Sequence, residues 1–288
     1  MSKGISLHIG INSVDDTHYR TSIFAADGWN GALKGCEIDA TALEQLAQSR
    51  GFKTRKLLTK EATRKNVVAE IERAATNLEK GDYFFLTYSG HGSQVRDLSG
   101  DEKQDAHVAL ADRRDETWCL YDAQLLDDEL YGLWSKFEDG VRILVISDSC
   151  HSGTVTRGGI DGSSLIPPEG MAYRFMPKAG MTATYKSHKA FYDQLQSKTS
   201  KRSRIKARVL LFSGCQDFEM SREDQSSEQP GGLFTKSILS AWKSEAYSNY
   251  ADFFRAVKNN MPDEKQAPNY YAFGEEGVSF EQEAPFVI

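Results

Sequence analysis

Two side chains that could together form an activated nucleophile each follow a short apolar segment. His91 comes after the segment FFLTYSG, and Cys150 comes after ILVISDS. An imidazole beside a thiol can take its proton to give a thiolate, and can later protonate a leaving amine. The two side chains can meet if the segments are neighbouring parallel strands, because ligands of such sheets collect at the carboxyl ends of the strands. We therefore predict Cys150 as nucleophile and His91 as its general base.

His151 adjoins Cys150 and is the alternative base. Because neighbours on an extended segment point to opposite sides, we expect His151 to face away from the thiol. The other cysteines are far apart and form no CxxC pair, which argues against a zinc site and a disulfide framework. We expect reduced thiols with packing roles at Cys36, Cys119 and Cys215, as in a cytoplasmic protein.

Glycines accompany both reactive residues. Gly92 and Gly153 would let a substrate backbone come close, because neither carries a side chain. The backbone amides of Gly92 and Cys150 could then stabilise a tetrahedral oxyanion.

The elements that must position these groups alternate along the chain. Apolar runs typical of buried parallel strands occupy Ile5–Ile11, Phe52–Leu58, Tyr83–Tyr88, Val141–Ser147 and Val209–Ser213. Helical spacing covers about 36–47, 67–78 with Thr63 as N-cap, 127–137, 232–242 and 249–261. This alternation predicts an α/β sandwich on a mainly parallel sheet. The stretches 92–126 and 153–206 do not fit it, and we expect long functional or disordered loops there.

The overall composition argues against some classes of binding partner. The chain has 288 residues, a net charge of −6, 40% hydrophobic residues and a sequence pI of about 5.6. An acidic chain of ordinary globular composition argues against nucleic acid or an anionic membrane as the main partner. No apolar run is long enough to cross a membrane, and the N-terminal segment lacks the pattern of a secretory signal.

The motifs around the reactive residues resemble a known family. The segments 88–92 (YSGHG) and 148–153 (DSCHSG) together resemble the paired signature of metacaspases, within the wider caspase-like peptidases. The segments 33–40 (LKGCEIDA), 213–217 (SGCQD) and 231–235 (GGLFT) resemble further family motifs in the same order. The resemblance spans about residues 5 to 280. It implies a caspase-like three-layer α/β/α sandwich and one peptidase domain over 1–288. The large-subunit part would cover about 1–197 and the small-subunit part about 205–288, with a basic linker between them.

The resemblance also implies the substrate pocket. Asp148 lies two residues before Cys150, on the same side of a regular strand. Asp39, Ser89 and Asp148 match the residues that line the S1 pocket of metacaspases, which binds a P1 Arg or Lys. A carboxylate pair suits a guanidinium through charge-assisted bonds. The alternatives are another P1 preference, and an Asp39 that only occupies the first turn of a helix.

A basic cluster lies where the family divides its subunits. A peptidase that cuts after basic residues could process itself there, and the candidates are Lys198, Lys201, Arg202 and Arg204. The alternative is a solvated charge run, which is the commoner meaning of such a tract.

Calcium activates many metacaspases, and part of its ligand set is present. Asp115, Asp127 and Asp128 match three family ligands, and three carboxylates with carbonyls and water would suffice for the ion. Arg157 stands at the fourth position, where a cation would repel calcium or pair with the same acids. The sequence therefore favours activity with no required cofactor, and calcium binding is the alternative.

These observations predict a cysteine endopeptidase acting on proteins or peptides with a basic P1 residue, with no nucleic acid or membrane partner and as a monomer. The alternative from another class is a non-catalytic caspase-like module used for binding or regulation. The chain has no GxSxG, P-loop or GxGxxG motif, which disfavours serine hydrolases, P-loop NTPases and dinucleotide enzymes.

Overall fold

A six-stranded sheet forms the centre of the computed structural model, which describes residues 2–22, 27–96, 114–150, 167–199, 204–215, 220–226, 228–244, 246–262, 266–274 and 277–288. Its strand order is β12-β9-β7-β3-β1-β2. The five parallel strands coincide with the five runs predicted from the sequence, and β12 is antiparallel to β9. The bounds are β1 (Gly4–Gly10), β2 (Lys53–Leu58), β3 (Tyr83–Ser89), β7 (Arg142–Asp148), β9 (Arg208–Ser213) and β12 (Asn269–Gly274).

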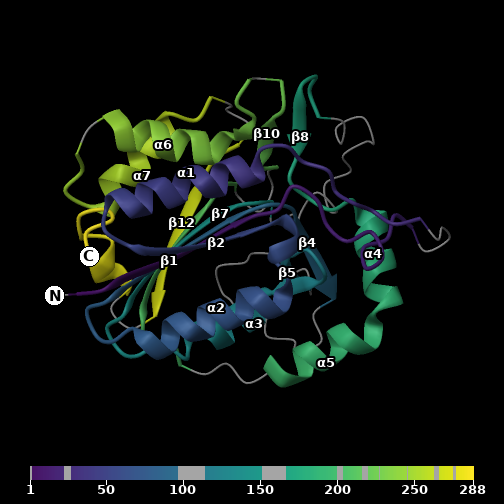
Figure 1. Ribbon diagram of the computed structural model, residues 1–288, viewed down its shortest axis with the longest axis horizontal. Coiled ribbons are helices and arrows are strands. Elements are labelled where there is room, and N and C mark those ends of the chain that lie inside the picture. Colours follow the sequence, from purple (N-terminus) through teal and green to yellow (C-terminus); the bar gives the residue numbers. More distant parts are fainter. Residues whose placement is uncertain are drawn as a thin grey trace.

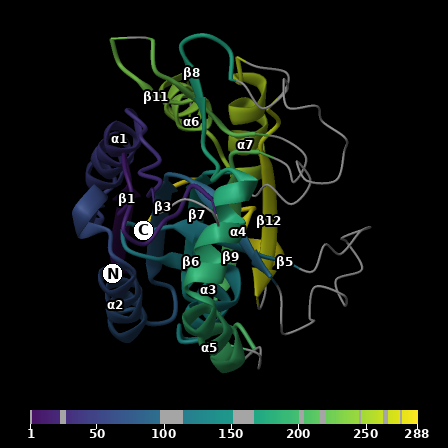
Figure 2. The ribbon, with the colours of Figure 1, turned by 90° about the vertical axis from the view of Figure 1, so that its right-hand side faces the viewer.

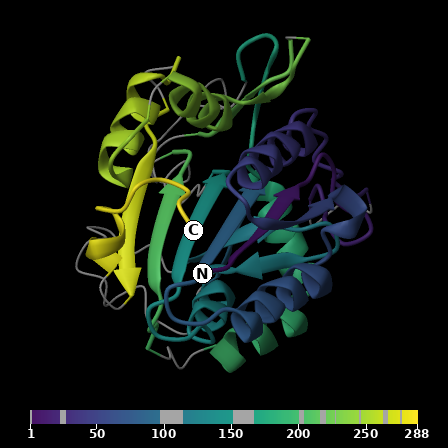
Figure 3. The ribbon, with the colours of Figure 1, turned by 60° about the vertical axis from the view of Figure 1, so that its left-hand side comes forward.

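Helices cover both faces of this sheet, so the molecule has three layers (Figures 1 and 3). On one face lie α1 (Cys36–Ser49), α6 (Leu233–Ser244) and α7 (Tyr250–Asn259); on the other lie α2 (Arg64–Asn77) and α3 (Asp127–Trp134). A short helix, α8 (Gly277–Phe280), packs against β9 and β12. Each face has its own apolar core, as the nearly continuous hydrophobic character of the parallel strands requires. The predicted α/β sandwich and the Thr63 N-cap of α2 are confirmed.

The two stretches expected to be long loops contain regular structure, and that prediction was wrong. Residues 92–126 include a small antiparallel sheet of β4 (Gly92–Arg96), β5 (Arg114–Cys119) and β6 (Gln124–Leu126). Residues 153–206 include β8 (Met171–Tyr173), α4 (Lys178–Ser187) and α5 (Lys189–Thr199). Strands β8, β10 (Arg222–Asp224) and β11 (Gly231–Gly232) form a third sheet, which is separate from the central sheet and lies to one side of it (Figure 2). Strands β6, β8, β10 and β11 have only two or three residues each, so they are too short to show a periodic pattern in the sequence. A 3₁₀ turn, η1 (Thr59–Glu61), follows β2.

The register of the central sheet decides where the reactive residues lie. Strands β3 and β7 are parallel neighbours, and Ser89 pairs with Asp148 at their carboxyl ends. His91 and Cys150 each follow two residues after that pair. The two residues therefore leave the same edge of the sheet side by side.

His8 is a neutral histidine inside the sheet, where it is fully buried on β1 and hydrogen-bonded to the hydroxyls of Ser6 and Thr87. Burial, with the nearby charge of Lys56 adding to it, lowers the pKa of His8 to about 3. An unfolded chain takes up this proton near pH 6.5, whereas the folded chain does not until about pH 3. His8 should therefore cost stability only below pH 6.5.

We expect the free energy of unfolding to fall on acidification, with His8 contributing up to about 1.4 kcal/mol per pH unit below 6.5. Urea unfolding of the wild type and of His8→Gln between pH 7.5 and 4.5 measures this. The variant should show the shallower pH dependence. Equal slopes would contradict a neutral buried His8.

Candidate active site

The backbone brings Gly92 against the reactive cysteine. A Cβ built on Gly92 would lie 1.8 Å from the carbonyl oxygen of Cys150, an approach that no side chain allows. Glycine at this position is therefore required by the close contact of the two strand ends. It also allows the amides of Gly92 and Cys150 to point at one spot.

The imidazole of His91 is oriented by a backbone carbonyl. Its Nε2 lies 2.9 Å from the carbonyl oxygen of Gly31. Because a carbonyl only accepts, Nε2 must carry the proton, and in the neutral ring Nδ1 then holds the lone pair. Nδ1 is buried and has no hydrogen-bond partner. This is the form of histidine that can accept a proton.

The environment keeps this imidazole neutral. Burial lowers the pKa of His91 to about 4, against the effect of its bond to Gly31, and the charge of Arg174 lowers it further. The ring also lies against the indole of Trp29, with 4.7 Å between centroids. At neutral pH His91 is thus uncharged and able to act as a base.

The thiol of Cys150 is turned toward another segment in this structure. The amide of Ser221 donates to Sγ at 2.8 Å, and Sγ lies 3.4 Å from the carbonyl oxygen of the same residue. Thiol and imidazole are not hydrogen-bonded to each other, although both lie at the same sheet edge. Catalytic hydrogen bonds of this kind often form only when substrate is processed.

The carbonyl oxygen of Arg174 occupies the spot at which the two amides point. The amide of Gly92 donates to it at 3.0 Å and the amide of Cys150 at 3.1 Å. Two backbone donors converging on one carbonyl beside a thiol form the geometry of an oxyanion hole.

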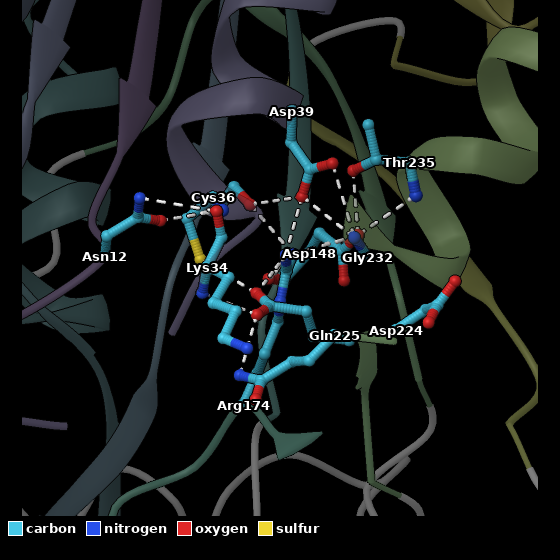
Figure 4. A network of polar contacts seen from close by, with 12 residues as sticks. Asn12, Lys34, Cys36, Asp39, Asp148, Arg174, Asp224, Gln225, Gly232 and Thr235 are labelled. Atoms are coloured by element: carbon cyan, nitrogen blue, oxygen red, sulfur yellow. Dashed lines mark hydrogen bonds and ion pairs between the residues drawn. The ribbon is translucent and has the colours of Figure 1, made fainter. Parts of the chain in front are cut away.

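The side chain of the same arginine lies among carboxylates (Figure 4), and it is fully buried. Its Nη2 lies 2.6 Å from Asp39 and 3.0 Å from Glu223. Its Nη1 donates to Ser89 at 2.8 Å and lies 3.2 Å from a carboxylate oxygen of Asp148. The structure thus brings Asp39, Ser89 and Asp148 to a single guanidinium.

The ionisation of Arg174 and the ionisation of the carboxylates around it depend on one another. Burial opposes ionisation of Arg174, yet Asp148, Asp39 and Glu223 hold its pKa well above the usual range. Burial would raise the pKa of Glu223, but Arg174 lowers it. Burial raises the pKa of Asp39 to about 6, although Arg174 acts in the opposite direction. Without a bound cation, the pKa values of Asp39 and Glu223 would be higher still, because burial would act on them unopposed.

Neighbouring donors hold the carboxylates in place. Thr235 at the start of α6 donates its amide and its hydroxyl to Asp148, at 3.0 and 2.7 Å. The amide of Gly232 donates to Asp39 at 3.1 Å. A Cβ on Gly232 would come within 2.1 Å of Asp148 and 2.5 Å of Arg174, so the pocket requires glycine there. The start of α6 also favours a negative charge through the helix dipole.

Sequence reasoning did not identify Arg174, Glu223 or Ser221 as parts of this site. Arg174 is the one charged residue of the segment 171–177 (MAYRFMP), and Glu223 stands between Arg222 and Asp224; neither belongs to a motif that sequence analysis singled out. Cys36 was expected to be a packing residue, and it is buried with its Sγ 3.6 Å from a carboxylate oxygen of Glu223. The only available signal was charge complementarity: a pocket predicted to bind arginine could be filled by one from the chain itself.

Other predicted site residues lie elsewhere. Asp115 on β5 and Asp128 on α3 are buried, and Asp127 accepts the amide of Asp128 at the start of α3. Among the described residues, no three His, Cys, Asp or Glu side chains group as metal ligands would, and calcium binding by these acids stays a prediction. Arg157 and His151 fall outside the described residues.

Two of the proposed cleavage positions can be located. Lys198 is exposed near the end of α5, and Arg204 is exposed before β9. Lys201 and Arg202 lie outside the described residues.

The chain resembles known peptidases in sequence. The family model described as caspase domain (Peptidase_C14) matches residues 5–275. Metacaspase-1 of Mycosarcoma maydis is 27% identical over 267 residues, with 81% of this chain and 64% of that protein covered. Metacaspase-1A of Aspergillus fumigatus is 26% identical over 270 residues, with 81% and 63% covered. The chain therefore spans somewhat less than two thirds of the length of these relatives.

A solved structure matches the whole fold. The crystal structure of protein GSU0716 from Geobacter sulfurreducens superimposes with a TM-score of 0.82 at 41% identity, covering 99% of both chains. The sequence motifs, the layered sheet and the family match agree. This chain therefore belongs to the caspase-domain family, and its sequence is similar to that of metacaspases.

Proposed function

We propose that this chain is a cysteine endopeptidase that cuts peptide bonds after Arg or Lys, with Cys150 as nucleophile and His91 as base. One observation carries the proposal: a single arginine places its carbonyl on two backbone amides beside the thiol while its guanidinium lies among three carboxylates. Reacting carbonyl and recognised side chain belong to the same residue, as they do in a P1 residue.

The chemistry follows from the placement of the groups. His91 Nδ1 takes the thiol proton, and the thiolate attacks the P1 carbonyl carbon. The amides of Gly92 and Cys150 stabilise the oxyanion. The imidazolium then protonates the leaving amine, and water hydrolyses the thioester. For this cycle the Cys150 thiol must leave its contacts with Ser221.

The pocket favours basic P1 residues by charge. Asp39, Asp148 and Glu223 would each repel an acidic side chain and would leave their charges uncompensated around a neutral one. Guanidinium is the better match because its planar group donates to several acceptors at once. An ammonium reaches fewer of them, so Lys should be the weaker substrate.

The proposal requires no cofactor, because thiol, imidazole and amides supply every step. The described part of the chain has no helix that could span a membrane. Activity in the cytoplasm, action as a monomer and the division into large- and small-subunit parts remain predictions.

Fluorogenic peptides with Arg, Lys, Asp or Asn at P1 test the class and the pocket together. We expect turnover after Arg and, more slowly, Lys, because only cations match the carboxylates. Cys150→Ala and His91→Ala should abolish it, and a chelator should leave it unchanged. Cleavage after Asp or Asn would contradict the pocket assignment. Absence of turnover under all conditions, calcium included, would favour a non-catalytic module.

Glu223 is the carboxylate that the structure adds to the pocket predicted from the sequence. Truncating one member of a buried, hydrogen-bonded charge pair costs about 2–5 kcal/mol, or roughly 30-fold and upward. We expect Glu223→Gln and Asp39→Asn each to lower kcat/KM for Arg peptides by at least that factor. The exposed Glu228 offers a matched control, and Glu228→Gln should act as wild type. An unchanged kcat/KM in Glu223→Gln would remove Glu223 from the site.

A further inference from the structure

We propose that residues 171–175 are the chain's own first substrate, that the bond between Arg174 and Phe175 is the self-cleavage site, and that this segment closes the cleft until it is cut. The inference rests on the proposed function and goes beyond it by naming the bond and the regulation. It also replaces the basic cluster near residue 201 as the expected processing site.

The segment before the bond lies as an added strand. Met171, Ala172 and Tyr173 of β8 pair antiparallel with β10, with Tyr173 opposite Arg222. The amide of Arg174 continues this ladder and donates to the carbonyl of Ser221 at 3.0 Å. Adding a strand to a sheet edge is a general way for a protein to bind an extended peptide. Backbone pairing thus fixes residues 171–174 as P4 to P1.

The segment after the bond is held as well. The amide of Met176 donates to the carbonyl of Gly92 at 2.9 Å, and the Met176 side chain is fully buried. Phe175 itself forms a parallel β-bridge with Gly92, the residue that follows His91, so the nitrogen that would leave belongs to a residue held beside the strand end that carries the imidazole. The bond is therefore anchored on both sides, with its carbonyl in the oxyanion hole.

The cleavage step balances with water as the one co-reactant. The Cys150 thiolate bonds to the carbonyl carbon of Arg174, and the bond from that carbon to the Phe175 nitrogen breaks. The proton taken by His91 goes to this nitrogen. Water then cleaves the thioester, which leaves a carboxylate on Arg174 and restores the thiol.

The orientation of the Cys150 thiol explains how residues 171–175 can lie in the site without being cut. With Sγ held by the backbone of Ser221, the arginine can occupy the pocket without being attacked. While it does so, a substrate arginine cannot enter, because Arg174 fills the acidic pocket and its carbonyl takes both amides. The segment is joined to the rest of the chain at both ends. Cutting the bond after Arg174 removes one of these two connections and lets residues 171–174 dissociate.

The competing position in the described linker is less suited to cleavage. Lys198 lies on a helix, whereas the ladder with β10 requires an extended peptide. Arg204 is exposed, whereas Arg174 is fully buried between the two backbone amides and the carboxylates.

Mass spectrometry and N-terminal sequencing of purified full-length chains test the proposal, with turnover of a P1 Arg peptide measured on the same samples. We compare the wild type with Cys150→Ala, Arg174→Lys and Phe175→Pro. The last variant keeps the arginine among its charge partners but turns the bond into a tertiary amide. Arg204→Gln serves as the control for the basic cluster.

We expect a wild-type fragment that begins at Phe175, and an intact Cys150→Ala chain. Arg174→Lys keeps the charge and should be cut at the same bond, while Arg204→Gln should behave as wild type. Phe175→Pro should stay intact, with peptide turnover at least about tenfold below the processed wild type, because the closed segment reduces the competent fraction.

Two outcomes would overturn the inference while leaving the proposed function intact. One is a wild type that hydrolyses Arg peptides with residues 174 and 175 still joined. The other is a Phe175→Pro chain as active as the processed wild type. Absence of Arg-peptide hydrolysis by every chain would instead reject the proposed function, and the inference with it.

Discussion

A buried arginine shared by three carboxylates connects the parts of this molecule that form the site. Arg174 meets Asp39 from α1, Asp148 from the end of β7 and Glu223 from β10. A cation in such a place is stable only with all of its partners, because removing one partner of a buried pair typically costs about 3–5 kcal/mol. The third sheet is thereby fixed against the central one by the same charges that would select a substrate.

The central sheet supplies the second constraint. Parallel pairing of β3 with β7 places His91 and Cys150 at one edge, and Gly92 allows the two strand ends to touch. From there the amides point away from the sheet, toward the carbonyl of Arg174. Under the proposed function, the edge of the central sheet would provide the reacting groups, and the small sheet around β10 would align the peptide.

Much of the fold and part of the site could be predicted from the sequence. Buried parallel strands are apolar along most of their length, so apolar runs identified β1, β3, β7 and β9; β2 is a half-exposed edge strand, KTRKLL, and was identified by the apolar residues at the ends of its run. The order of strands then implied that His91 and Cys150 meet. Asp39, Ser89 and Asp148 came from the family resemblance, and in the structure they contact one arginine.

The rest could not be predicted, because it depends on long-range charge pairing. Strand β8 is three residues long and gains its place from backbone bonds to β10 and from the anchoring of Arg174, neither of which produces a periodic pattern. Glu223 looks like any exposed acid in the sequence. Strand β12, which sequence analysis did not identify, forms the antiparallel edge of the central sheet beside β9.

The central claim is that the acidic pocket and the two amides recognise one arginine as a P1 residue. The most direct test is hydrolysis of a synthetic peptide with the sequence of residues 170–177 (GMAYRFMP), followed by mass spectrometry of the products. The account predicts a single cut between arginine and phenylalanine by the wild type, and none in a peptide carrying aspartate in place of the arginine. Equal cleavage of both peptides, or an uncut arginine peptide in the presence of an enzyme that hydrolyses other Arg substrates, would contradict it.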